Sequence, residues 1–168
     1  MHDAHDCSQC PLADRRRFIS DLARLASGAL ISAGLYPRAA AALPIRFGEA
    51  LLRDGNVVRY PIPVDDGATI DRNAQVILVR YQQSIFAFRR TCPHQNTALR
   101  WRERDGRFQC PKHNSRYTPD GNFITGRATR GMDRFPVTRD GETVAVDTAR
   151  FYKQDEDAAG WESARVDL

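Results

Sequence analysis

Two short loops, each holding one cysteine and one histidine, constrain this chain more than any other feature of its sequence. They are Cys92-Pro93-His94 and Cys110-Pro111-Lys112-His113, so the pattern is C-x-H, fifteen residues, then C-x-x-H. Thiolates and imidazoles are metal ligands that suit either zinc or an iron–sulfur cluster. Zinc sites more often pair two cysteines on one segment and two histidines on another, whereas each loop here mixes the two residue types.

The other four candidate ligands, His2, His5, Cys7 and Cys10, all fall within the first ten residues. A C-x-x-C pair can act in redox chemistry or bind a metal. These residues precede three arginines at 15–17 and a mildly apolar stretch at 22–35, which Ala39-Ala40-Ala41-Ala42 follows. This order is typical of an export signal, and paired arginines before Phe18 resemble the bacterial twin-arginine signal.

We therefore predict that residues 1–43 are a twin-arginine signal peptide or an N-terminal anchor and that the protein is periplasmic. Cleavage near Ala41 or Ala42 would remove Cys7 and Cys10 from the mature chain. An amphipathic helix packed on the domain is one alternative. Retention as an anchor is another, in which residues 18–36 contact the membrane; the apolar segment is shorter than the roughly 20 residues of a full span.

Short β-branched and aromatic runs separated by Asp-Gly turns predict an all-β, antiparallel domain over residues 44–150. The runs lie at residues 57–62, 76–81, 84–88, 123–124, 135–137 and 143–146. Gln82-Gln83 is expected to form a hairpin turn although it lacks glycine. Residues 151–168 are acidic and polar, and we expect a mobile C-terminal tail from Lys153 onward. Trp161 could pack against the domain or a partner and so hold this tail in place.

The mixed Cys/His loops resemble those of the Rieske iron–sulfur proteins, and C-P-x-H-x-S-x-Y at 110–117 extends the resemblance. It implies stacked antiparallel sheets over about residues 45–147, with a small cluster-binding subdomain at 92–136. It also implies one [2Fe–2S] cluster per chain, with Cys92 and Cys110 on the buried iron and His94 and His113 on the outer iron. Four core residues at accidental spacing are the alternative.

Ser115 and Tyr117 match the family's serine and tyrosine that donate hydrogen bonds to a cluster sulfur and to a cysteine sulfur. Such donors stabilise the reduced cluster and raise its potential. The resemblance therefore implies the upper half of the Rieske range, which spans roughly −150 to +300 mV. Two ordinary loop residues are the alternative interpretation.

The sequence departs from the Rieske proteins of cytochrome bc complexes at the two extra cysteines that join their loops. Thr97 and Lys112 stand at these positions, and residues 126–129 read Gly-Arg-Ala-Thr where that group has Gly-Pro-Ala-Pro. These departures, together with the twin-arginine pattern, make the chain more similar to the small Rieske subunit of arsenite oxidases. The family then implies a larger molybdopterin- or heme-containing subunit and a c-type cytochrome as partners.

We therefore predict a one-electron transfer subunit of an oxidoreductase complex, without a substrate site of its own, that passes electrons to a heme protein. The alternatives are the quinol-oxidising subunit of a cytochrome bc complex, a ferredoxin component of a dioxygenase system, and a structural zinc domain. The chain outside residues 1–43 has no histidine left for the iron triad of an oxygenase.

Basic residues gather around the two loops, and 23 of the 25 basic residues in the chain are arginines. They are either a solvated basic surface or a docking face for an acidic redox partner. The net charge of +4 and the lack of aromatic residues interleaved with the arginines argue against nucleic acid as a partner.

Overall fold

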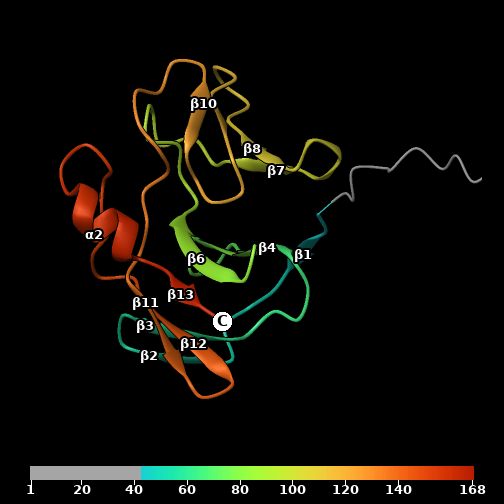
Figure 1. The fold of residues 1–168 in the computed structure, drawn as a ribbon, viewed down its shortest axis with the longest axis vertical. Coiled ribbons are helices and arrows are strands. Elements are labelled where there is room, and N and C mark those ends of the chain that lie inside the picture. Colours follow the sequence, from blue (N-terminus) through green and yellow to red (C-terminus); the bar gives the residue numbers. More distant parts are fainter. Residues whose placement is uncertain (1–42) are drawn as a thin grey trace, which may run out of the picture. The chain divides into compact units, whose positions relative to one another are not determined.

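Three β-sheets form the body of residues 43–168, the part of the chain that the computed structural model describes (Figure 1). The central sheet has the order β1-β4-β5-β6-β13, with β1 Ile45–Phe47, β4 Gly67–Asp71, β5 Val76–Tyr81, β6 Ser84–Arg89 and β13 Val166–Asp167. The second sheet has the order β11-β12-β3-β2, with β11 Val137–Asp140, β12 Thr143–Asp147, β3 Val57–Pro61 and β2 Leu52–Asp54.

The third sheet has the order β10-β9-β8-β7 and carries the ligand loops at its end of the fold (Figure 1). Its strands are β7 Arg100–Arg102, β8 Arg107–Gln109, β9 Arg116–Tyr117 and β10 Phe123–Thr125. A 3-10 turn at Glu103–Asp105 joins β7 to β8, and one α-helix, α2, spans Ala158–Ser163. The predicted all-β class is confirmed.

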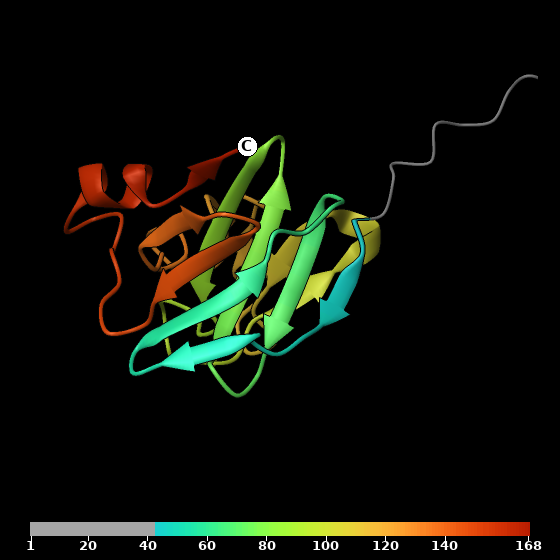
Figure 2. The same cartoon turned by 90° about the horizontal axis from the view of Figure 1, so that it is seen from below.

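The central sheet is buried on both faces, which explains the continuous apolar run of β5. Ile77 and Val79 pack into one core, which also contains Trp101, Phe108 and Tyr117 of the third sheet. The intervening Val76 and Leu78 pack with Val58, Tyr60, Val144 and Val146 of the second sheet into the other core. Because neighbouring side chains of a strand point to opposite faces, a strand between two cores must be apolar at every position. Figure 2 shows β5 and β6 behind β3 and β2.

The strand predictions are correct for most of the long runs. All pairings within the sheets are antiparallel except that of β1 with β4, which is parallel. The strands at β1, β2, β4, β7, β8 and β9 were not predicted, because they are short or carry arginine and glycine in place of β-branched residues. Gln82 and Gln83 form the expected hairpin turn with φ of 49° and 64°, a conformation that glycine or asparagine usually supplies.

The prediction of a mobile C-terminal tail is wrong. Residues 151–168 contain α2 and β13, and β13 pairs with β6 at the edge of the central sheet. Trp161 is fully buried, and its Nε1 donates a hydrogen bond of 2.7 Å to the carbonyl of Met132. The guanidinium of buried Arg134 lies 3.4 Å from the Trp161 ring centroid and donates to the Trp161 carbonyl. One buried aromatic side chain therefore orders a segment that is polar by composition.

The predictions for the N-terminal segment lie outside the described residues. These are the twin-arginine signal or anchor, the membrane contact through residues 18–36, and any role of Cys7 and Cys10. Within residues 43–168 no helix has the length and apolar character needed to cross a membrane.

Candidate metal centre

The two ligand loops share one backbone conformation. The amide of Cys92 donates to the carbonyl of Thr97, and the amide of Cys110 donates to the carbonyl of Ser115, both at 2.8 Å. Each pair closes a loop of six residues that begins at a cysteine. The backbone therefore folds back on itself in the same way twice and presents two similar tips.

An asparagine four residues after each cysteine makes this turn possible. The amides of Asn96 and Asn114 donate to the carbonyls of Cys92 and Cys110 at 2.9 and 3.0 Å. Both asparagines have positive φ, 51° and 56°, in the left-handed region that asparagine tolerates better than most residues. These two residues were not predicted, although an asparagine at the same offset in both loops is visible in the sequence.

The four predicted ligands come together as two inner thiols and two outer imidazoles. The side chains of Cys92 and Cys110 are buried and unbridged, while His94 and His113 are half-buried. The two imidazole rings are 5.0 Å apart between centroids and inclined at 73°. The histidines therefore lie closer to solvent than the cysteines, while their assignment as iron ligands stays a prediction.

Both histidines have a ring nitrogen that lacks a partner. The Nδ1 atoms of His94 and His113 are buried and have no hydrogen-bond partner among the described residues. Burial, assisted by the nearby Arg127, lowers the pKa of His113, which favours the neutral imidazole that a metal ligand requires. Two unpartnered imidazole nitrogens beside two buried thiols fit the donor set of a Rieske [2Fe–2S] centre.

A single metal ion suits this arrangement less well than a cluster. No three His, Cys, Asp or Glu side chains within residues 43–168 lie close enough together to hold one ion. A tetrahedral zinc site needs its four ligand atoms within about 2.0–2.3 Å of one centre. Four ligands that are divided between two irons, two to each, can have their ligand atoms farther apart. The structural zinc alternative is therefore disfavoured.

Ser115 is fully buried and lies where it can donate a hydrogen bond. Its Oγ accepts hydrogen bonds of 3.1 Å from the amides of Arg127 and Ala128, so its own proton is not used in these contacts. Gly126 makes the approach possible, because a Cβ there would lie 2.4 Å from the Ser115 Cα and the backbone has a φ of +117°. The glycine of residues 126–129, which we call the third loop, thus allows backbone donors to reach the serine.

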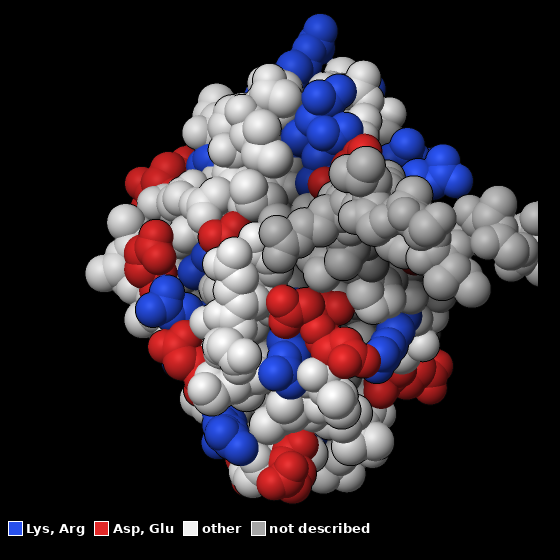
Figure 3. All heavy atoms as spheres, turned by 45° about the vertical axis from the view of Figure 1, so that its right-hand side comes forward, with Lys and Arg blue, Asp and Glu red and all other residues white. Residues whose placement is uncertain are grey.

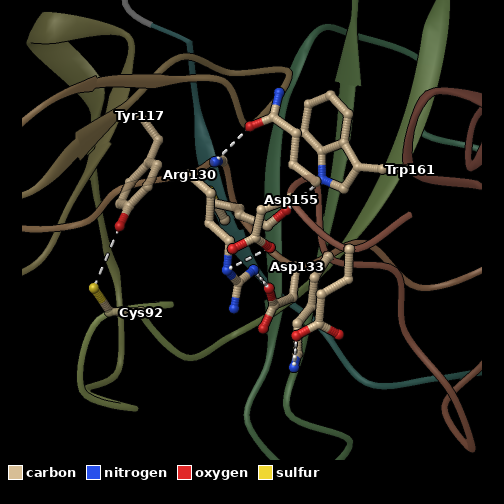
Figure 4. Close-up of polar contacts among 11 residues, drawn as sticks. Cys92, Tyr117, Arg130, Asp133, Asp155 and Trp161 are labelled. Atoms are coloured by element: carbon tan, nitrogen blue, oxygen red, sulfur yellow. Dashed lines mark hydrogen bonds and ion pairs between the residues drawn. The ribbon is translucent and has the colours of Figure 1, made fainter. Parts of the chain in front are cut away.

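Tyr117 is fully buried, and its hydroxyl lies 3.3 Å from Sγ of Cys92 (Figure 4). Burial, followed by the hydrogen bond to Cys92, raises the pKa of Tyr117 above its ordinary value. The hydroxyl therefore keeps its proton at physiological pH, and toward a thiolate it can act only as the donor. Its ring packs against Phe123 of β10 with centroids 6.0 Å apart.

Packing replaces the missing disulfide between the loops. Thr97 and Lys112 occupy the two positions, and Cys92 and Cys110 are the only cysteines within residues 43–168. Beneath the loops, the rings of Trp101 and Phe108 pack with centroids 4.6 Å apart and an interplanar angle of 57°, and Leu99 is buried in the same core. The loops therefore rest on a continuous apolar core.

The C-terminal segment supports the third loop, a role that was not predicted from the sequence. Arg130 is paired with buried Asp133 and, at 3.2 Å, with Asp155 (Figure 4). The amide of Gly131 donates to the side chain of Gln154 at 2.7 Å. These contacts connect residues 151–168 to Arg130 and Gly131, which directly follow the third loop. Only Trp161 hinted at this contact in the sequence.

Comparisons with known proteins identify the kind of domain that carries these residues. Residues 60–136 match the family model of the Rieske [2Fe–2S] domain. The cytochrome b6-f complex iron-sulfur subunit of Synechococcus sp. (strain JA-3-3Ab) is 24% identical over 161 residues, covering 86% of this chain and 92% of that protein. A cytochrome b6-f complex iron-sulfur subunit 3 of Nostoc sp. (strain PCC 7120) is 46% identical over 37 residues, which is 22% of this chain and 21% of that protein.

Among solved structures, a chain of a hyperthermophilic respiratory Complex III is 20% identical, with a TM-score of 0.42, covering 79% of this chain and 98% of that one. The plasma membrane Rieske protein PetC3 of Synechocystis PCC 6803 is 22% identical, with a TM-score of 0.40, covering 54% of this chain and 85% of that one.

Proposed function

Residues 60–136 of this chain are a Rieske [2Fe–2S] domain, and we propose that it works as a one-electron transfer subunit of a larger oxidoreductase complex. The cofactor is a Rieske-type [2Fe–2S] cluster. We assign Cys92 and Cys110 to the buried iron and His94 and His113 to the outer iron. The observation that carries this assignment is the pair of buried, unpartnered Nδ1 atoms beside two buried free thiols.

When bound, such a cluster takes up and releases one electron. The chain's own residues would tune and direct this transfer. Tyr117 donates toward the Cys92 sulfur, and the contacts of Ser115 with the amides of Arg127 and Ala128 do not use its own proton, so both hydroxyls can stabilise the additional negative charge of the reduced state. The half-buried His94 and His113 bring the outer side of the centre nearest to solvent, so we assign electron exit to this side.

The partner that best fits the relatives is a cytochrome bc-type complex, in which this chain would be the quinol-oxidising iron–sulfur subunit. The support is that curated relatives aligned with most of the chain are named iron-sulfur subunits of cytochrome b6-f complexes. The second candidate is the small subunit of an arsenite-oxidase-like enzyme with a molybdopterin partner. Thr97 and Lys112 in place of the loop cysteines favour it. A ferredoxin component of a dioxygenase system ranks third.

We further propose that the protein is periplasmic and that residues 1–43 are its export signal or its anchor. The support is the order of arginines, apolar residues and alanines in that segment. Mass spectrometry of the protein from its native source would show either a chain beginning near residue 42 or the intact N-terminus. The same purified complex would contain heme in a bc-type assembly and molybdenum in an arsenite-oxidase-like one.

Electron paramagnetic resonance of the dithionite-reduced protein tests the cluster and its ligands. We expect an average g value below that of clusters with four cysteine ligands, together with equal iron and sulfide contents. His113→Ala should abolish this signal, whereas Thr97→Ala should retain it because Thr97 follows the first ligand pair without belonging to it. Colourless protein with stoichiometric zinc would refute the proposal.

A further inference from the structure

Positive charge is concentrated in the part of the fold that carries the ligand loops. Residues 89–130, which we call the cationic lobe, contain ten Arg and Lys but only three Asp and Glu, a net charge of +7. The other described residues, 43–88 and 131–168, together contain ten Arg and Lys and fourteen Asp and Glu, a net charge of −4. The near-neutral balance of the whole chain therefore hides a strong separation of charge.

Most of the basic side chains in the cationic lobe have no ion-pair partner within residues 43–168. Outside the lobe, six of the ten described basic residues form ion pairs with described carboxylates, but within it only Arg107 and Arg130 do. The other eight are Arg89, Arg90, Arg100, Arg102, Arg104, Lys112, Arg116 and Arg127. In Figure 3 basic side chains gather at the upper end, which holds β7–β10, while acidic ones are concentrated in the middle and lower parts.

A groove of about 650 Å³ adjoins both ligand loops, between this lobe and the strands β1 and β4. Thr97 of the first loop and Pro111 of the second line it, Leu99 and Trp101 give it an apolar floor, and three arginines, Arg72, Arg90 and Arg100, surround it. Nε of Arg90 is buried without a hydrogen-bond partner among the described residues. A ligand surface that fits here carries acidic groups around an apolar side chain.

We propose that the cationic lobe is the docking surface for an acidic heme protein that receives the electron. The inference rests on the proposed function, because it assigns the partner's charge to the face where the half-buried histidines lie. Like charges this dense repel one another, and an acidic partner relieves that repulsion on docking. The opposite charge of the rest of the fold turns the ligand loops toward such a partner as it approaches.

Two small oxidants of opposite charge test the electrostatic potential at the cationic lobe. The full-length, cluster-loaded protein is reduced with ascorbate and mixed in stopped flow with hexacyanoferrate(III), an anion, or tris(phenanthroline)cobalt(III), a cation. Each takes one electron. We expect the rate constant with the anion to fall as ionic strength rises, because salt screens the attraction, and that with the cation to rise.

Charge reversal identifies the residues. Arg100 and Arg102 flank buried Trp101 on β7, and both are exposed on the other face of the strand. Arg100→Glu/Arg102→Glu should lower the rate with the anion about tenfold at low salt. The matched control, Arg53→Glu/Arg139→Glu, changes the net charge equally on the exposed edge strands β2 and β11 and should leave the rate within about twofold. At high salt the rates should converge if the effect is electrostatic.

A macromolecular competitor tests docking itself. Poly-L-glutamate should protect the reduced wild-type protein and the control pair from hexacyanoferrate(III), but not the Arg100→Glu/Arg102→Glu variant. Equal effects of the two variant pairs, or no protection, would overturn the proposal. Arginine-dependent binding to phosphatidylglycerol vesicles without protection by poly-L-glutamate would instead make the lobe a membrane surface. Loss of the paramagnetic signal in wild-type protein would point to failure of the proposed function instead.

Discussion

Replacing Tyr117 by phenylalanine removes one hydroxyl from a fully buried site and changes little else. The hydroxyl lies 3.3 Å from Sγ of Cys92, and the raised pKa keeps it protonated. The ring can stay between Phe123 and the apolar core, because phenylalanine has the same shape. The substitution therefore tests the hydrogen bond rather than the packing.

The expected effect is a lower reduction potential with the cluster retained. A hydrogen bond to a charged acceptor contributes about 1.5–3 kcal/mol, and only its strengthening on reduction affects the potential. If that strengthening is about 1 kcal/mol, removal of the hydroxyl lowers the potential by about 40 mV, since about 1.4 kcal/mol corresponds to about 59 mV for one electron.

Protein-film voltammetry of the cluster-loaded protein at pH 7 measures this shift. Tyr60→Phe is the matched control, because Tyr60 is an equally buried tyrosine whose hydroxyl donates to Asp71 in the other core, at 3.1 Å. We expect that control to leave the potential within about 10 mV, well below the expected shift of about 40 mV. An unchanged potential in Tyr117→Phe, or equal shifts in both variants, would refute the role assigned to Tyr117.

Three further predictions concern stability. Trp161→Ala should lower the free energy of unfolding by about 3–5 kcal/mol in urea titrations, because it empties a buried site and removes the ring beneath Arg134; an unchanged value would mean that the C-terminal segment is not docked. Gly126→Ala should reduce iron content and melting temperature by its clash with Ser115, whereas Gly141→Ala, which has positive φ but nothing within 4 Å, should retain the iron. Because burial raises the pKa of Tyr60, the folded state holds a proton that the unfolded state releases, so the free energy of unfolding should fall above about pH 10. Tyr60→Phe should make this fall less steep by about 1.4 kcal/mol per pH unit, and an unaltered pH dependence would refute this assignment.

The ligand set stays a prediction, and it comes from sequence because it consists of residue types at fixed local spacing. C-x-H and C-x-x-H each lie within one short loop, so the chain positions the residues of each pair without help from distant contacts. The strands β5 and β6 were predictable for a similar reason, because apolar runs flanked by turn residues are local signals. The short strands under the loops were missed because tertiary pairing, rather than propensity, makes them strands.

The sequence by itself determined the all-β class and indicated the candidate donor atoms, because these follow from local patterns of side chains. Only the tertiary structure decided that residues 151–168 are ordered, since Trp161 gains its burial from Arg134 and Met132, which lie 27 and 29 positions away along the chain. Only the fold likewise left two imidazole nitrogens buried without partners among the described residues, and placed Arg72 beside Arg90 and Arg100 around one groove. Burial and long-range electrostatics depend on which distant residues meet, and local sequence does not specify those meetings.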